Sequence, residues 1–400
     1  MTSMKVHMRP LDLSLRIFGL SHFAQTSRVT PVTENIPPEK QSTRRHVLPR
    51  ILRVYCICIC CLLVVNVLRY IPSFWVGYDF VPNITALRIV FLLWFTQNAV
   101  TAIVLFVFFD KNEHFERYAE QYNRVINDSI SKQLKTNPGC NKTKRCMIRV
   151  LVIGWVAVIF NTVSVVLLNF IDISPVIPVL LCNPFPYNSI IMRILGCLIH
   201  FLSSGVWALP VVLHYSLTSA LQLRFEELYR VMETTALDQC EDRFDILKNV
   251  RQKHLQLCEM VNTVDQSLSF YIGNVFTVSM GISCFATYVV INDIDFASNV
   301  SEAVLFIFWI ASSFFQLFFI SKNSATLNEK AHDLSSVVFN INLDGATMQN
   351  IAQVNLLVTK LHGPPIGLSV LGIITITKEM ILTLIGVFLT YFFLLFQFRI

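Results

Sequence analysis

The sequence predicts an all-α membrane protein with seven transmembrane helices. Of its 400 residues, 54% are hydrophobic and only 14% are charged, a balance far from that of a soluble domain. A helix needs roughly 20 mainly apolar residues to cross a bilayer. Seven runs reach that length, and they are continuously apolar, unlike the alternating strands of a membrane β-barrel. The runs are residues 54–74, 89–109, 149–170, 190–217, 268–291, 302–321 and 377–398.

Basic residues set the orientation of these spans, because Lys and Arg resist translocation. A cytosolic amino terminus places 28 of the 32 Lys and Arg residues on the cytosolic side. Residues 1–50 have no apolar run typical of a signal peptide, so the first span is expected to act as its own insertion signal. The carboxyl terminus is then extracellular. The net charge of +6 is explained by cytosolic loops beside anionic lipid, and it indicates no nucleic-acid partner.

The longest loops are predicted to lie in the cytosol and to be helical. Leu221, Phe225, Leu228 and Met232 recur at helical spacing with charges between them, so the fourth and fifth helices are expected to continue into the cytosol. A second amphipathic stretch, "DGATMQNIAQVNLLVTKLHGPP", ends at a glycine and two prolines, which stop a helix before the last span begins.

Short motifs in the loops agree only partly with this topology. The sequons at Asn83 and Asn299 fall in outer loops and predict glycosylation there. Those at Asn127 and Asn141 fall in a basic inner loop, where we interpret them as chance matches.

No metal site or enzyme motif is recognisable. The cluster "CICICC" spreads around one apolar helix, whereas a structural zinc site needs converging ligands. His200 and His214 lie fourteen residues apart on one span, too far to share an ion, and each is expected to bond a neighbouring helix or to contact a ligand. The chain also lacks a phosphate-binding glycine loop, a nucleophile elbow and a His-Glu-x-x-His sequence. We therefore expect no enzyme, no cofactor and no bound metal.

The last span carries a narrow stripe of small and polar residues. At 100° per residue the stripe occupies an arc of about 80° on an otherwise apolar helix. It fits either a seam where helices pack closely or a wall that faces water, and geometry leaves both open. The stripe consists of Thr383, Gly386, Thr390, Leu394 and Gln397.

The carboxyl terminus resembles the signature of insect gustatory receptors. That signature is Thr-Tyr, five apolar residues and Gln-Phe, here Thr390, Tyr391, "FFLLF", Gln397 and Phe398. The preceding "GLSVLGIITITKEMILTLIGV" and the early "RPLDLSLRIFGL" also resemble the family. The resemblance implies a ligand-gated cation channel in the plasma membrane of chemosensory neurons, assembled as a homotetramer or with related subunits. The pore and gate residues it implies are Thr383, Thr390, Leu394, Gln397 and Phe398.

The resemblance also implies a tastant pocket within the outer halves of the middle helices. The family's sweet-taste branch has Glu after the Thr-Tyr pair, whereas this chain has Phe392, which favours a bitter or other non-sweet compound over fructose or another sugar. Aromatic, amide and imidazole side chains there would suit a small molecule. The candidate ligand-binding residues are Trp94, Gln97, Asn161, His200, Trp207, Tyr288 and Trp309.

We interpret the chain as four parts. Residues 1–53 form a cytosolic segment, 54–321 hold six spans and the pocket, 322–376 form a cytosolic anchor, and 377–400 form the pore-lining helix. Two alternatives remain. A G-protein-coupled receptor would place its amino terminus and the basic residues outside. A transporter would favour internal repeats, and none is detected.

Overall fold

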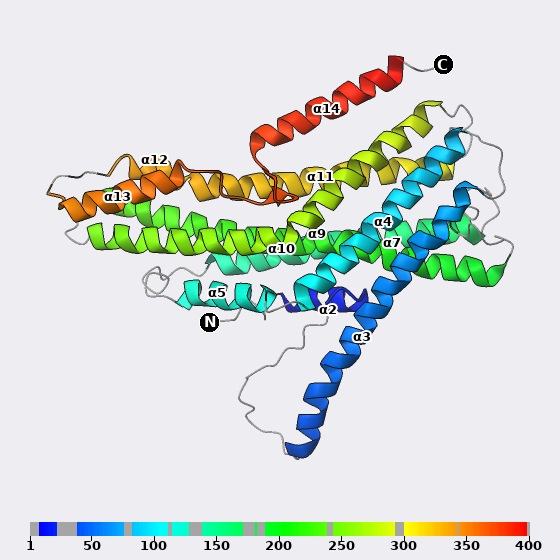
Figure 1. The fold of residues 1–400 in the computed structure, drawn as a ribbon, viewed down its shortest axis with the longest axis horizontal. Coiled ribbons are helices and arrows are strands. Elements are labelled where there is room, and N and C mark those ends of the chain that lie inside the picture. Colours follow the sequence, from blue (N-terminus) through cyan, green and yellow to red (C-terminus); the bar gives the residue numbers. More distant parts are fainter. Residues whose placement is uncertain are drawn as a thin grey trace.

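Long helices run side by side through most of the molecule (Figure 1). Seven of them coincide with the predicted apolar runs. They are α3 (Pro38–Tyr70), α4 (Pro82–Asp110), α7 (Pro138–Phe170), α9 (Ile190–Leu237), α10 (Arg243–Asn292), α11 (Val300–His332) and α14 (Lys378–Gln397). This computed structural model describes residues 8–21, 38–75, 82–110, 114–127, 138–170, 181, 189–237, 243–292, 300–341, 343 and 345–397.

Six of the described helices, α3, α4, α7, α9, α10 and α11, are long and apolar enough to cross a membrane. That α14 also crosses it, making seven spans, stays a prediction. The first candidate span ends at Phe74, as predicted, but its last turn changes type: α3 stops at Tyr70 and Ile71–Phe74 form the 3₁₀ helix η1. Pro72 lacks the N–H that a continuing α-helix would need there. A short helix, α5 (His114–Asn127), follows α4.

The fourth and fifth helices extend far beyond a membrane, as predicted. α9 has 48 residues and α10 has 50, which correspond to lengths of about 72 and 75 Å, more than twice a bilayer core of about 30 Å. The predicted apolar stripe of Leu221, Phe225 and Leu228 is buried. Figure 1 shows these extensions beside α12 (Leu334–Val338) and α13 (Met348–Leu361).

Helix α13 lies within the predicted amphipathic stretch and ends where the sequence predicts. The Thr347 side chain caps its start by accepting a hydrogen bond from the Asn350 backbone N–H at 3.3 Å. The helix ends at Leu361, just before Gly363 and the two prolines. Its buried face packs on the bundle, whereas Met348 and Leu356 are exposed.

The amino-terminal helix α2 (Arg9–Ile17), which the sequence analysis did not anticipate, packs against the bundle. Phe18, just after it, lies between the rings of Trp155 and Phe201, at centroid distances of 5.5 and 5.1 Å. A Cβ at Gly205 would overlap the Phe18 ring, so only glycine allows this approach. The Trp155 indole also donates a hydrogen bond to the Ser14 hydroxyl at 3.0 Å.

A two-stranded hairpin interrupts the otherwise helical fold. Strands β1 (Ser369–Val370) and β2 (Ile374–Thr375) pair antiparallel, so the expectation of an all-α chain needs this correction. Leu371 and Gly372 lie in the turn with positive φ values of +55° and +74°, and the Ile373 N–H closes it by donating to the Val370 carbonyl at 3.0 Å. The Leu371 N–H donates to the Ser269 carbonyl of α10 at 3.1 Å, and the Leu371 side chain covers Gly273. These contacts hold leucine in a conformation that it rarely adopts.

Side chains of α10 and α11 fasten the segment that leads into α14. The Asp265 carboxylate accepts from the Ser369 N–H at 2.6 Å and from the Ser369 hydroxyl at 2.8 Å. The His332 ring bridges the Leu361 carbonyl at 2.7 Å and the Ile366 N–H at 3.1 Å. The hairpin is thus a fixed base for the last helix.

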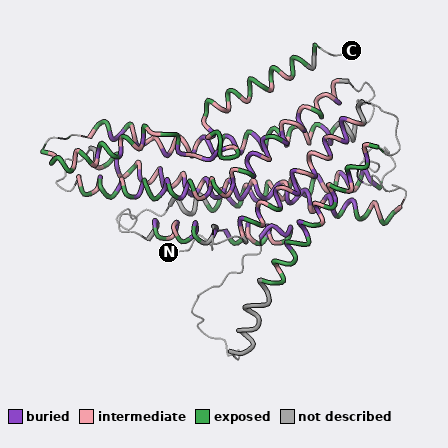
Figure 2. Tube along the Cα trace, viewed as in Figure 1, coloured by how far each residue is buried: buried purple, intermediate pink, exposed green. Residues whose placement is uncertain are grey.

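Helix α14 stands away from the bundle above this base (Figure 1), and most of its length is exposed (Figure 2). It contacts α11 through the Phe314 and Phe388 rings, whose centroids are 4.8 Å apart. It contacts α10 through the Tyr391 hydroxyl, which donates to the Cys284 carbonyl at 3.2 Å.

The structure tests only some of the predictions made from the loops and the cysteines. Asn299 lies outside the described residues, and the Asn83 side chain, at the start of α4, is not described. Cys56 and Cys60 are buried whereas Cys58 is exposed, as expected for residues around one helix. In the part of the chain that the structure describes, no three His, Cys, Asp or Glu side chains converge as a metal site would require.

Replacing Asp265 by Ala should loosen the hairpin. The change removes a charged acceptor and leaves the Ser369 N–H, in a residue that is 5% exposed, without its partner. Hydrogen–deuterium exchange of residues 366–376 should accelerate about thirtyfold, equivalent to about 2 kcal/mol. Glu259→Ala, at an exposed site on the same helix, is the control. Equal exchange in both variants would show that the carboxylate does not hold the hairpin.

Candidate functional site

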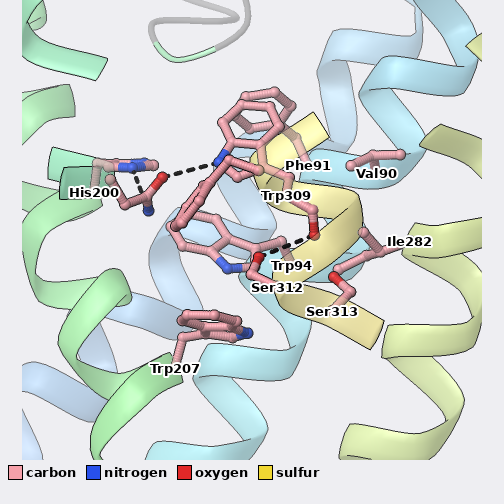
Figure 3. Close-up of a pocket in the computed structure, with 11 residues that line it drawn as sticks. Val90, Phe91, Trp94, His200, Trp207, Ile282, Trp309, Ser312 and Ser313 are labelled. Carbon is pink, nitrogen blue, oxygen red and sulfur yellow. Dashed lines mark hydrogen bonds between the residues drawn. The ribbon is translucent and has the colours of Figure 1, made fainter. Parts of the chain in front are cut away.

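A pocket lies between five helices of the bundle (Figure 3). The pocket and its opening together contain about 430 Å³ of empty space. α4 and α11 supply most of the aromatic wall, and α7, α9 and α10 complete it. The lining residues are Val90, Phe91, Trp94, Asn161, His200, Trp207, Ile282, Phe308, Trp309, Ser312 and Ser313.

The Asn161 side chain joins three of these helices. Its Oδ1 accepts from the Trp309 indole N–H of α11 at 2.9 Å. Its Nδ2 lies 3.0 Å from His200 Nε2 and donates to the Ser204 hydroxyl of α9 at 2.9 Å. The Ser204 hydroxyl in turn donates to the His200 carbonyl at 2.8 Å. Asn161 is 4% exposed, and these bonds use both hydrogens and the oxygen of its amide.

This network assigns the tautomer of His200. An indole N–H can only donate, so the oxygen of the Asn161 amide must face Trp309 and its NH₂ group must face His200. His200 Nε2 is therefore an acceptor, and the ring proton sits on Nδ1. The ring is neutral and is held in place without any charged partner.

Aromatic rings enclose the polar network. The Trp94 ring covers His200, with centroids 4.8 Å apart and planes tilted by 38°. The Phe91 and Phe306 rings meet Trp309 edge to face, at 5.3 and 5.2 Å. Edge-to-face pairs are worth about 1 kcal/mol beyond their buried area, so they help to fix the pocket wall.

The structure brings together five of the seven candidate ligand-binding residues: Trp94, Asn161, His200, Trp207 and Trp309. Their contact with a ligand stays a prediction.

The other two candidates lie elsewhere. Gln97 does not line the pocket, because its amide turns toward α11 and donates to Gln316 Oε1 at 3.3 Å. Gln316 then donates to the Trp207 carbonyl at 3.4 Å, which places this pair behind the pocket wall. Tyr288 packs in an apolar cluster with Leu305 and Phe306.

Sequence reasoning missed six lining residues, among them Phe91, Phe308, Ser312 and Ser313. Phe91 lies three positions from Trp94, and Ser312 lies three positions from Trp309. Residues three or four apart share one helix face, so this spacing was the available signal.

The two histidines of α9 bond neighbouring helices, as predicted. His200 bonds Asn161 of α7, and His214 Nε2 lies 3.1 Å from the Ser324 hydroxyl of α11.

The stripe on α14 does not pack against any other helix that the structure describes. Gly386, Thr390 and Gln397 are exposed, and a Cβ at Gly386 would meet no described atom. The hydroxyls of Thr383 and Thr390 donate to carbonyls of their own helix. The face toward the bundle consists of Met380, Ile381, Leu384, Phe388 and Tyr391.

These two faces of α14 differ by about 130° around the helix axis. Among the described residues, the stripe therefore forms no packing seam with another helix of its own chain. Leu394 of the stripe is 46% exposed, whereas Phe398 lies outside the described residues.

These features define a polytopic helical membrane protein with an aromatic pocket inside its bundle. The model of the 7tm chemosensory receptor family matches residues 8–400. The chain therefore belongs to the 7tm chemosensory receptor family. This is a family of receptors and not of enzymes, in agreement with the sequence.

Solved structures show the same fold. The chain is similar to the insect olfactory receptor OR5 from Machilis hrabei, with a TM-score of 0.70 and 14% identity over 98% of both chains. It is also similar to the same receptor in complex with eugenol, with a TM-score of 0.64, 14% identity and 98% coverage of both chains. No curated protein matches the chain.

Replacing Asn161 by Ala should destabilise the bundle. The change leaves the Trp309 indole and His200 Nε2 without their protein partners in a largely apolar pocket wall. We expect a loss of about 1–3 kcal/mol, seen as a lower melting temperature of the purified protein. Thr162→Ala, on the next residue of the same helix, removes a hydroxyl that bonds nothing in the described chain and is the control. Equal melting of the two variants would refute the role of Asn161.

Proposed function

We propose that the chain is a gustatory receptor that acts as a ligand-gated, non-selective cation channel. A small non-sweet tastant opens it from the pocket between α4, α7, α9, α10 and α11. The observation that carries this proposal is the aromatic pocket, which one chain forms by itself. A related fold in complex with eugenol supports a small organic ligand. The Thr390–Tyr391 and Gln397–Phe398 pairs favour a taste receptor over an olfactory one.

The pore is proposed to lie along the stripe of α14. Its polar residues are exposed and face away from their own bundle, and four copies around an axis would enclose a water-filled path. Leu394 and Phe398 would close this path by repelling water, and Gln397 would offer a polar group to a passing cation.

Exposed Met348 and Leu356 of α13 would contribute to contacts between subunits, in a homotetramer or with related chains in the plasma membrane of chemosensory neurons. The mass of the purified particle tests the number of chains.

Helices α10 and α11 would transmit the ligand's effect to α14, because each of them lines the pocket and also contacts α14. Ser313 of α11 lines the pocket, and the next residue, Phe314, packs on Phe388 of α14. Ile282 of α10 lines the pocket, and two residues later the Cys284 carbonyl holds Tyr391. A ligand that shifts either helix would therefore move the last helix on its fixed hairpin base.

Expression of the chain alone, with calcium imaging against sugars and bitter plant compounds, tests this function directly. Ser313→Phe should fill the pocket and abolish the response to an agonist found in this screen, because Ser313 is 4% exposed and lines the cavity. Leu394→Ser should raise the basal current, and this current should persist when Ser313→Phe is added, which separates a blocked pocket from a missing channel. The control is Ser336→Phe, at an exposed site on α12. An unchanged response in Ser313→Phe would place the ligand elsewhere.

Cysteine substitution tests the pore. Cysteines at Thr383, Thr390, Leu394 and Gln397 should react with a small charged thiol reagent in open channels, because these positions face water. Cysteine at Leu384, on the face toward the bundle, should stay protected. Uniform protection of the stripe in the presence of agonist would leave it as a packing seam between subunits.

A further inference from the structure

Two strong hydrogen-bond acceptors of the pocket wall are already bonded to other residues of the wall. The Asn161 oxygen is occupied by the Trp309 N–H, and His200 Nε2 is occupied by the Asn161 NH₂ group. The Ser312 hydroxyl donates to the Trp309 carbonyl at 3.0 Å, so its proton is committed while its oxygen can still accept. The hydroxyl oxygens of Ser312 and Ser313 are therefore the main side-chain acceptors left for the N–H or O–H groups of a ligand.

Donors, in contrast, remain free in the pocket wall. Trp94 and Trp207 both line the cavity, and within the described part of the chain neither indole N–H has an acceptor. Figure 3 shows hydrogen bonds that reach His200 and Trp309 but none that reaches Trp94 or Trp207. An indole N–H donates only, and it prefers a partner when it is buried.

The wall carries no full charge. None of its residues is Asp, Glu, Lys or Arg, and the network holds His200 neutral. A cationic ligand would lose its hydration in this pocket without gaining a carboxylate. A sugar presents many hydroxyl donors, for which the wall offers few acceptors. The broad indole and phenyl faces suit a flat ring.

We infer that the pocket selects a neutral, flat aromatic compound that carries hydrogen-bond acceptors, such as an aromatic lactone, and that the indole N–H groups of Trp94 and Trp207 recognise those acceptors. This inference rests on the proposed role of the pocket as the ligand site, and it goes further by naming the ligand class and the selecting atoms.

Three probes of the same two-ring shape separate the contributions. Naphthalene has no acceptor, coumarin adds a lactone, and N-methylquinolinium adds a positive charge. Their affinities for the full-length protein in lipid nanodiscs can be measured by equilibrium dialysis, with empty nanodiscs as the blank. Coumarin should bind about three- to tenfold more tightly than naphthalene, the factor expected for a net hydrogen bond. N-methylquinolinium should bind more weakly than both.

Phenylalanine variants test whether the indole N–H groups cause the preference for coumarin over naphthalene. Trp94→Phe combined with Trp207→Phe keeps aromatic rings but removes both N–H groups, so the preference for coumarin should disappear while naphthalene binding is retained. A purely structural defect would weaken both probes alike. Trp75→Phe, at a residue that is 78% exposed and lies outside the pocket, is the matched control.

The remaining outcomes separate this inference from the proposed function. Equal binding of coumarin and naphthalene, or a coumarin preference that survives in the double variant, would overturn the inference and leave the pocket as a ligand site. Tightest binding of N-methylquinolinium would overturn it in favour of an aromatic cage for cations. Binding of none of the probes, beside agonist currents that Ser313→Phe abolishes, would overturn the ligand class alone. Probe binding unchanged by Ser313→Phe would overturn both.

Discussion

Polar side chains inside a membrane bundle must find partners on neighbouring helices, because lipid offers none. Asn161 meets this requirement for three helices at once, through Trp309 on α11 and through His200 and Ser204 on α9. The geometry is restrictive because each group has a fixed role as donor or acceptor. The amide therefore sets the relative depth of α7, α9 and α11, and the pocket forms around it.

Other polar side chains in the bundle also bond partners on neighbouring helices. Gln97 and Gln316 link α4 to α11, and Gln316 also reaches the carbonyl of Trp207. His214 and Ser324 link α9 to α11. These pairs hold the helix positions behind the pocket wall, so the wall has rigid support on its inner side, while α14 is fastened mainly at its hairpin base.

Much of the fold was predictable because its causes are local. Continuous apolar runs located the helices, and the spacing from Leu221 to Met232 showed that α9 continues beyond the membrane. The hairpin could not be predicted in this way. Its strands are two residues long. Leu371 adopts a left-handed conformation because its N–H bonds the Ser269 carbonyl and its side chain packs over Gly273 of α10.

The pocket was predictable to the extent that polar residues and tryptophan are rare within the spans. That rarity selected Asn161 and His200, which lie together, but it also selected Gln97, which turns away. The sequence does not record which neighbour an amide meets, since Gln316 lies 219 residues from Gln97 in the chain. Phe308 was missed because a phenylalanine in an apolar span carries no distinguishing signal.

All eleven residues of the pocket wall belong to one chain. If the pocket acts as proposed, recognition of a ligand is a property of the individual polypeptide. In an assembly of identical chains, every chain would then carry the same binding site, and the dose–response curve would report how many sites must be occupied. In a mixed assembly, each kind of chain would bring its own site. The range of compounds sensed would then grow by combining subunits, without any change to an existing binding site.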